Sequence, residues 1–419
     1  MIGAPAGTIV AIRGGLVQAR MPALFIGAGA TIATRDGRRI PARVSAVDGP
    51  RVSLAPFAGV DGIAAGDRIA ADPDALEICV GTACLGRAID ALGAPLDRGP
   101  ALSGKRGGTR GTGMPADRSA IGRRFTTGIR AIDGPLAFGV GARIGIFGAP
   151  GCGKSTLLET IVDGSSADVT IVALVGERGR EAERWLARLD GRTTIVCATS
   201  DRSAAERLRA AEVAFVQAEA QRRRGLDVLL VLDSLARVAA AARDLAVAAG
   251  EPVGRGGYPP SVFSLLTGLL ERAGQFRCGS ITLVATVLTD GADERDPVSD
   301  ACRSVLDGHI ALSERLARQG WFPAIDIPAS TSRTLAEVAA PAHLAAAHLL
   351  RHAVAVLDET REARGFGLDP GAGDPAVRRA IAAEGAVAAF LRQRLPADSG
   401  ATLTELGMLA DTLSDGYSR

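Results

Sequence analysis

The sequence predicts an α/β protein with a mostly parallel central sheet, preceded by a small all-β domain and followed by a helical domain. From about residue 140 to 330, apolar strand-like runs alternate with helical stretches, which is typical of βαβ units. Short strand-like runs punctuated by Gly and Pro occupy the first 76 residues, as in a small barrel or sandwich. Beyond residue 340 the chain is rich in Ala and Leu at helical spacing. We therefore expect three domains with boundaries 1–76, 77–340 and 341–419.

Length and composition agree with a multidomain globular protein. A chain of 419 residues is too long for one hydrophobic core. The net charge of +2 gives no general argument for nucleic acid or an acidic membrane as the main partner. We expect no signal peptide, because Met1 is followed by small residues without a basic segment and an apolar core. Six cysteines without a C-x-x-C pair indicate free thiols in a reduced, cytosolic compartment.

The individual elements follow from local patterns. In the first domain, strands are predicted at 8–12, 16–19, 42–47 and 51–54, whereas the Gly- and Arg-rich segment 98–119 reads as a surface loop. Helices are predicted at 204–224 and 261–273 in the central domain, and at 344–364 and 375–394 in the tail. The strands of the central domain are expected to end at Phe147, Val175, Ala198, Leu232 and Leu288.

The most specific motif is GAPGCGKS at residues 148–155, which fits the phosphate-binding pattern G-x-x-x-x-G-K-[ST]. A strand-like run precedes it and a helical run follows, which is the context that the motif requires. Lys154 can reach the β- and γ-phosphates, and the Ser155 hydroxyl can bind Mg²⁺. Glycines let the backbone curl so that its N–H groups point at phosphate oxygens. The residues expected to contact the nucleotide here are Gly148, Ala149, Pro150, Gly151, Cys152, Gly153, Lys154, Ser155 and Thr156.

A carboxylate follows the next strand, in the segment LVGERGR. Glu177 would lie at the carboxyl edge of the sheet, where ligands of α/β proteins bind. A carboxylate there can orient the water that attacks the γ-phosphate. Arg178 beside it could neutralise phosphate charge. A surface ion-pair loop is the alternative interpretation of this segment.

An apolar strand that ends in Asp233 forms the second nucleotide motif, VLLVLDS. Asp233 would hold Mg²⁺, through water. Such strands are common, but this one follows a phosphate loop by about 80 residues with strands between, which makes it specific. Arg237 follows four residues later and could face the same phosphates.

Two further candidates lie near the end of the central domain. Trp321 and Phe322 precede a proline in a chain with only 4% aromatic residues, which suggests either a stacking platform for a base or a hydrophobic plug. Arg333 has no obvious partner nearby in the sequence. It could reach a neighbouring subunit as an arginine finger.

Taken together, these segments resemble one family. GAPGCGKSTLL, LVGERGRE, ATSDRS, LDSLAR, AAGEP, GYPPSVF, LLERAG, DPVSD, LDGHIALS, WFPAID and STSR occur in the order of the export ATPases of type III secretion systems. These are homologues of the catalytic β-subunit of F-type ATP synthases. The resemblance extends from Val80 to the helical tail.

The resemblance implies an N-terminal β-barrel, a RecA-like ATPase domain and a C-terminal helical domain, assembled as a homohexamer with ATP sites between subunits. It implies that Lys154 and Ser155 bind phosphate and Mg²⁺, and that Phe322 stacks on adenine. Glu177 would be the catalytic carboxylate, Asp233 a Mg²⁺-side residue, and Arg333 a residue that acts in trans. Arg178 and Arg237 would lie on phosphate.

The resemblance also implies partners and a place in the cell. We expect a central stalk protein, a stator or regulator protein, export-gate components and chaperone–effector complexes, but no nucleic acid. The expected location is cytoplasmic and peripheral to the inner membrane. The function would be to release and unfold exported proteins from their chaperones.

Three alternatives stay open at this point. The wording APGCGKSTLL and ATSDRS favours the injectisome branch of the family over the flagellar branch. A non-catalytic ring subunit is the second alternative, although the carboxylate Glu177 argues against it. The third is a hexameric RNA translocase, which would need stacking aromatics in the first domain, where only Phe25 and Phe57 occur.

Overall fold

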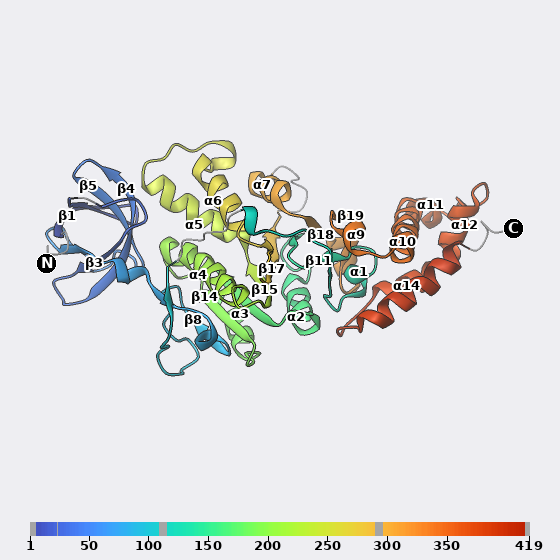
Figure 1. Cartoon of the computed structure of the whole chain (residues 1–419). Coiled ribbons are helices and arrows are strands. Elements are labelled where there is room, and N and C mark those ends of the chain that lie inside the picture. Colours follow the sequence, from blue (N-terminus) through green and yellow to red (C-terminus); the bar gives the residue numbers. More distant parts are fainter. Residues whose placement is uncertain (1–5, 23, 109–114, 290–295, 415–419) are drawn as a thin grey trace.

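The computed structural model describes residues 6–22, 24–108, 115–289 and 296–414. Three parts follow one another along an elongated molecule: a closed barrel, a central sheet with helices, and a helical end (Figure 1). The predicted α/β class with an N-terminal barrel and C-terminal helices is confirmed. Within the described ranges, we find no helix with the length and hydrophobicity needed to cross a bilayer.

The barrel closes because its first and third strands both pair with the last one. Alternate residues point inward to form a small separate core that includes Val17, Ile32 and Leu54. The sequence analysis did not predict the third and sixth strands, which are short and rich in Ala and Gly. In barrel order the strands are β1 (Ala6–Arg13), β2 (Leu16–Arg20), β5 (Arg51–Pro56), β4 (Arg39–Asp48), β3 (Gly29–Ala33) and β6 (Arg68–Ala71).

The central sheet is parallel except at β19 and the short β16 (Gly274–Gln275), so the carboxyl ends of its main strands share one edge. Its order is β19 (Ile325–Ser332), β18 (Gly308–Leu312), β12 (Arg143–Gly148), β17 (Ser280–Leu288), β15 (Asp227–Asp233), β13 (Val169–Val175), β14 (Thr193–Ala198) and β8 (Arg87–Ile89). Short pairs outside this sheet are β7 (Ile78–Cys79) with β9 (Arg106–Gly107), and β10 (Arg124–Phe125) with β11 (Phe138–Gly139).

Helices cover both faces of the sheet and form two separate cores. Strand β13 is buried along its whole length, as expected for a strand covered on both sides. One core contains Leu158 and Trp185, and the other contains Phe215 and Leu266. The helices of this part are α1 (Arg130–Asp133), α2 (Lys154–Gly164), α3 (Gly179–Leu186), α4 (Ala204–Arg222), α5 (Leu235–Ala248), α6 (Pro260–Leu270), α7 (Pro297–Val305), α8 (Glu314–Arg318) and α9 (Leu335–Val338).

The helical end packs onto the first of these cores through Leu350, Phe390 and Leu406. Its last helix was not predicted, because its sequence is rich in Thr and Gly and its apolar stripe is weak. That helix nevertheless packs along the first helix of the tail. The helices are α10 (Pro341–Glu359), α11 (Arg361–Gly365), α12 (Pro375–Ala382), α13 (Glu384–Leu391) and α14 (Ser399–Ser414).

Helix α4 of the central domain packs against the barrel. Arg209 on this helix is fully buried, and its guanidinium lies over the ring of Phe57 in the barrel, 5.0 Å from the ring centre. It donates to the carbonyl oxygens of Leu76 at 2.7 Å and Ala91 at 2.8 Å. One turn further on, Glu212 of α4 pairs with Arg43 of β4 at 2.7 Å.

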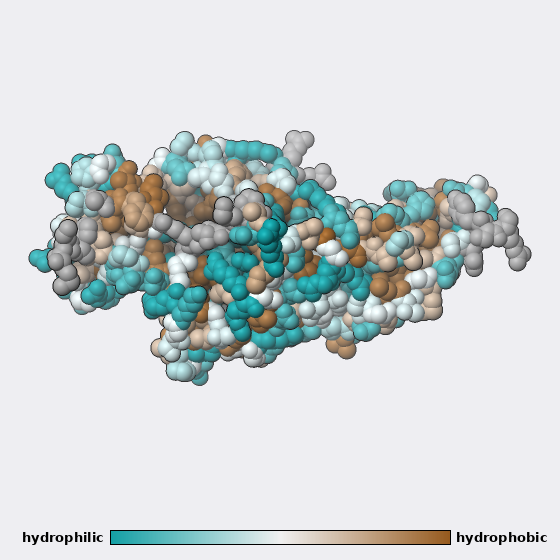
Figure 2. Space-filling model, in the orientation of Figure 1, coloured by the Kyte–Doolittle hydropathy of each residue, from teal (hydrophilic) through white to brown (hydrophobic). Residues whose placement is uncertain are grey.

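A groove of about 1090 Å³ lies beside this joint, between the barrel and helices α5 and α6. Figure 2 shows hydrophobic residues gathered in the hollow between these two parts. Phe25 and Ile26, both exposed, belong to the barrel side of the groove, and Leu245 and Leu265 belong to the helical side. The barrel therefore contacts α4 directly and leaves an apolar groove beside α5 and α6.

We expect Arg209→Met to destabilise the chain by about 2–6 kcal/mol. Methionine fills much of the volume but leaves two buried carbonyl oxygens without donors, at about 1–3 kcal/mol each. Urea unfolding followed by circular dichroism measures the change. Arg223→Met, at the exposed end of the same helix, is the matched control, and an equal loss in both variants would contradict this account of the joint.

Candidate active site

The phosphate loop connects β12 to α2 at the carboxyl edge of the sheet. Gly151 and Gly153 have φ angles of 84° and 86°, a left-handed conformation that residues with a Cβ rarely adopt. Helix α2 starts at Lys154, and no side chain caps its N-terminus. The first N–H groups of α2 are thus left to an anion, which the helix dipole also attracts.

The Lys154 ammonium folds back onto the loop. Its Nζ donates to the carbonyl oxygens of Gly148 at 2.7 Å and Ala149 at 2.6 Å. Burial lowers the pKa of Lys154, while the carboxylates of Asp233 and Glu177 act in the opposite direction. The ammonium group is therefore paired with the main chain of the phosphate loop itself.

Three carboxyl groups converge opposite the loop. Glu177 follows β13 and Asp233 ends β15, and each is only 7% exposed. Glu181, in the first turn of α3, completes the cluster, and oxygen atoms of the three residues lie within 4.8 Å of one another. The sequence analysis missed Glu181, because Glu177 precedes α3 and their four-residue spacing is therefore no helical signal.

The surroundings raise the pKa values of Glu177 and Asp233. Burial, followed by the charge of Asp233, raises the pKa of Glu177 to about 7. Burial also raises the pKa of Asp233, although Thr286 opposes the shift by donating to its Oδ1 at 2.6 Å. Arg237 donates through Nε to Oε1 of Glu177 at 2.8 Å. Glu177 can therefore change its protonation near neutral pH.

The donor set suits a hard divalent cation. Mg²⁺ prefers carboxylate and hydroxyl oxygens together with water and phosphate oxygens. Asp233 and the neighbouring carboxyl groups lie on one side, and Ser155 lies in the first turn of α2. The charge of a cation would also offset the cost of burying these acids.

Phe322 lies next to the phosphate loop and is 46% exposed. A Cβ atom placed on Gly153 would lie 3.7 Å from the Phe322 ring. The main-chain oxygen of Phe322 accepts a hydrogen bond from Gln393 N at 2.8 Å. A pocket of about 520 Å³ opens beside the ring, and its lining residues are Arg130, Gly320, Phe322, Arg392, Gln393, Arg394, Leu395 and Ala397.

The two remaining candidates are both exposed. Arg178 is exposed at the N-cap of α3. Arg333 is exposed just beyond β19, which runs antiparallel to β18, so that Ser332 is opposite Gly308 at the amino edge of the sheet. The phosphate loop lies at the other edge. The structure therefore brings Lys154, Glu177, Asp233, Arg237 and Phe322 to one edge and places Arg333 at the opposite one.

A parallel sheet with a phosphate loop and converging carboxyl groups at its carboxyl edge defines a P-loop nucleotide-binding protein. Residues 128–332 match the ATP synthase alpha/beta family, nucleotide-binding domain. The chain is 41% identical to the type 3 secretion system ATPase of Pseudomonas syringae pv. tomato, over 93% of this chain and 90% of the relative. It is 40% identical to the flagellum-specific ATP synthase of Treponema pallidum, over 92% and 88% of the two chains.

Solved structures agree with these relatives. The assembled ATPase EscN of the enteropathogenic E. coli type III secretion system superposes with a TM-score of 0.91 at 40% identity, over 96% of this chain and all of that one. EscN in complex with its central stalk EscO gives a TM-score of 0.87 over the same shares. The chain belongs to the family of type 3 secretion system ATPases and flagellum-specific ATP synthases, and it is an ATPase.

The raised pKa of Glu177 predicts a pH-dependent effect of Glu177→Gln on stability. Between pH 4.5 and about 7, unfolded Glu177 has lost its proton while the folded chain still holds it. The wild type therefore loses stability as pH rises through this window, and Gln does not. We expect the variant to gain on the order of 2 kcal/mol relative to the wild type between pH 4.5 and 8.

Urea unfolding of both proteins without nucleotide, at pH 5 and pH 8, measures this difference. Glu183→Gln, in the same helix as Glu181, is the control, because this side chain is exposed to water. If the difference in free energy of unfolding between Glu177→Gln and the wild type is equal at the two pH values, Glu177 ionises in the ordinary range.

Proposed function

We propose that this chain hydrolyses ATP with Mg²⁺ to energise type III protein secretion, and that it releases and unfolds exported proteins from their chaperones at the export gate. The observation that carries the proposal is the convergence of Glu177 and Asp233 opposite the Lys154 loop. A nucleotide-binding subunit without hydrolysis needs the loop alone. The carboxyl group of Glu177, with a pKa of about 7, supplies a group that can act on water.

Binding uses the phosphate loop and Phe322. The N–H groups of the loop and of the α2 N-terminus hold the phosphates, and Lys154 exchanges its carbonyl partners for phosphate oxygens. Adenine stacks on the exposed face of Phe322. Ser155 and Asp233 hold Mg²⁺, which when bound neutralises charge on the phosphates.

Hydrolysis proceeds by in-line attack of water on the γ-phosphate. Glu177 orients this water and accepts its proton, because the ionised carboxylate lies beside the loop. Arg237, which pairs with Glu177, and Arg178 lie near the phosphates and balance their negative charge. Electrostatic stabilisation in a site shielded from water supplies most of the rate.

The site is completed by a neighbouring subunit in a ring. Arg333 lies at the sheet edge opposite its own phosphate loop, which fits a role in the site of the next chain. An arginine supplied in trans stabilises the charge of the transition state. The assembled state of EscN supports a homohexamer, and the EscN–EscO complex supports a central stalk partner.

The remaining partners follow from the secretion role. We propose a stator or regulator protein, export-gate components and chaperone–effector complexes, and a peripheral position at the cytoplasmic face of the inner membrane. The flagellar branch is the second candidate, since the Treponema relative is 40% identical. Complementation of secretion and of motility mutants distinguishes the two branches.

We expect Glu177→Gln to lower ATP turnover by about a hundredfold or more while ATP binding is retained. The amide has nearly the same shape but cannot accept the proton of the attacking water. Phosphate release and binding of a fluorescent ATP analogue measure the two properties. Turnover near the wild-type level would remove Glu177 from the mechanism.

We expect Arg333→Ala to lower turnover by about a thousandfold, again with ATP binding retained, because the guanidinium contributes in the transition state. Arg318→Ala, on the exposed helix α8, is the control and is expected to turn over normally. Loss of binding in Arg333→Ala instead would assign Arg333 a structural role.

A further inference from the structure

One short segment connects the strand that carries the phosphate loop with Arg333. We call residues 303–307, which are the last three residues of α7 and the two residues before β18, the α7–β18 link. Arg303 begins this link, and its guanidinium lies over the ring of Phe147, 4.7 Å from the ring centre. Phe147 directly precedes Gly148, the first residue of the loop.

The Phe147 ring points away from the loop and back along its own strand. A Cβ atom placed on Gly145 would lie 2.4 Å from the ring, so the absence of a side chain there makes room for it. The ring also meets His309 edge-on, with centres 5.8 Å apart. Phe147 thus joins the main chain of the loop to the side chain of Arg303.

Arg333 is held by the other side of the same link. Its main-chain N–H donates to the main-chain oxygen of Asp307 at 2.9 Å, and its Nη2 donates to the main-chain oxygen of Arg303 at 3.4 Å. Both ends of the α7–β18 link therefore contact Arg333. A displacement of the link would move Arg333 with it.

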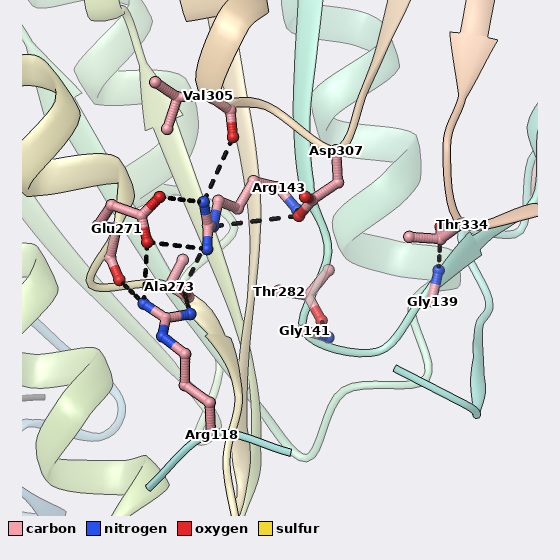
Figure 3. A network of polar contacts seen from close by, with 10 residues as sticks. All are labelled: Arg118, Gly139, Gly141, Arg143, Glu271, Ala273, Thr282, Val305, Asp307 and Thr334. Carbon is pink, nitrogen blue, oxygen red and sulfur yellow. Dashed lines mark hydrogen bonds and ion pairs between the residues drawn. The ribbon is translucent and has the colours of Figure 1, made fainter. Parts of the chain in front are cut away.

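A polar network fixes the link to the amino end of β12, as Figure 3 shows. Arg143 donates through Nη1 to the Val305 oxygen at 3.3 Å, and its main-chain N–H donates to Asp307 Oδ2 at 2.9 Å. Glu271 pairs with Arg143 at 2.8 Å and also with Arg118. Strand β12 thus carries the loop at one end and anchors the link at the other.

We propose that Arg303 is a positioning residue, which couples the phosphate loop of one subunit to the Arg333 that this subunit offers to its neighbour. The proposal rests on the proposed role of Arg333 in trans. The guanidinium of Arg303 stacks on the Phe147 ring, and its buried Nε has no hydrogen-bond partner among the described residues. The energy of a cation–π contact depends on the position of the ring. A movement of β12 that displaces the Phe147 ring therefore also displaces the Arg303 guanidinium.

The test is a mixed-ring experiment with full-length chains. We expect Arg303→Ala rings to lose turnover by about ten- to a hundredfold with unchanged binding of a fluorescent ATP analogue, because a small displacement of Arg333 is costly. Arg303→Ala chains are then co-expressed with Glu177→Gln chains under two different tags, and rings that contain both are purified. In such rings the Arg303→Ala chain supplies a site with an intact Glu177, and a neighbouring Glu177→Gln chain supplies a correctly placed Arg333. Turnover is therefore expected to rise several-fold above that of rings made from either variant alone.

A reference pair and a control separate the possible outcomes. Arg333→Ala with Glu177→Gln tests the trans role alone. Ser304→Ala is expected to behave as the wild type, because the Ser304 hydroxyl donates to the main-chain oxygen of Ala301 in its own helix. If turnover recovers in the mixed rings of Arg333→Ala with Glu177→Gln but not in those of Arg303→Ala with Glu177→Gln, Arg303 acts in the site of its own subunit. This result would overturn the proposed coupling between the phosphate loop and Arg333. No recovery in either pair would overturn the trans role and the coupling with it, and normal turnover of uniform Arg303→Ala rings would overturn the coupling alone.

Discussion

The burial of two carboxyl groups at one edge of a parallel sheet is the constraint on which the site depends. In the register of β13 and β15, Leu174 lies opposite Asp233, so Glu177 emerges three residues later over the same edge. Both strands are covered by helices on both faces, so water does not stabilise the ionised acids. Cations and hydrogen-bond donors must therefore surround them. Lys154, Arg237 and Thr286 are arranged to meet this need.

The nucleotide site could be predicted from local motifs, because each motif consists of an apolar strand followed by a few residues with fixed spacing. The loop at residues 148–155 and the strand ends before Glu177 and Asp233 were predicted in this way. Glu181 was missed because its part in the cluster depends on where α3 turns. Helix α14 and strands β3 and β6 were missed because packing, rather than a strong local pattern, determines them. Arg303 is invisible in the sequence, since its contact with Phe147 is purely tertiary.

Strand β19 explains why Phe322 and Arg333, which are close in the sequence, lie at opposite edges of the sheet. Phe322 precedes the strand and Arg333 follows it, so the length of β19 separates them across the sheet. Because β19 is antiparallel to β18, its start lies at the loop edge and its end at the amino edge. One edge strand thereby separates the two residues that we propose as the base platform of its own site and as the arginine of the next site.

The contact of Lys154 with two carbonyl oxygens has a further consequence for the catalytic cycle. An ammonium group without partners would make the empty loop unstable each time product left. Here the main chain of the loop supplies replacement partners at 2.7 and 2.6 Å. The affinity of the loop for a nucleotide therefore depends on the difference between two sets of hydrogen bonds, those that Lys154 makes to the loop and those that it would make to phosphate. Such a loop keeps its ammonium group hydrogen-bonded when no nucleotide is present, which suits the repeated ATP turnover that we propose.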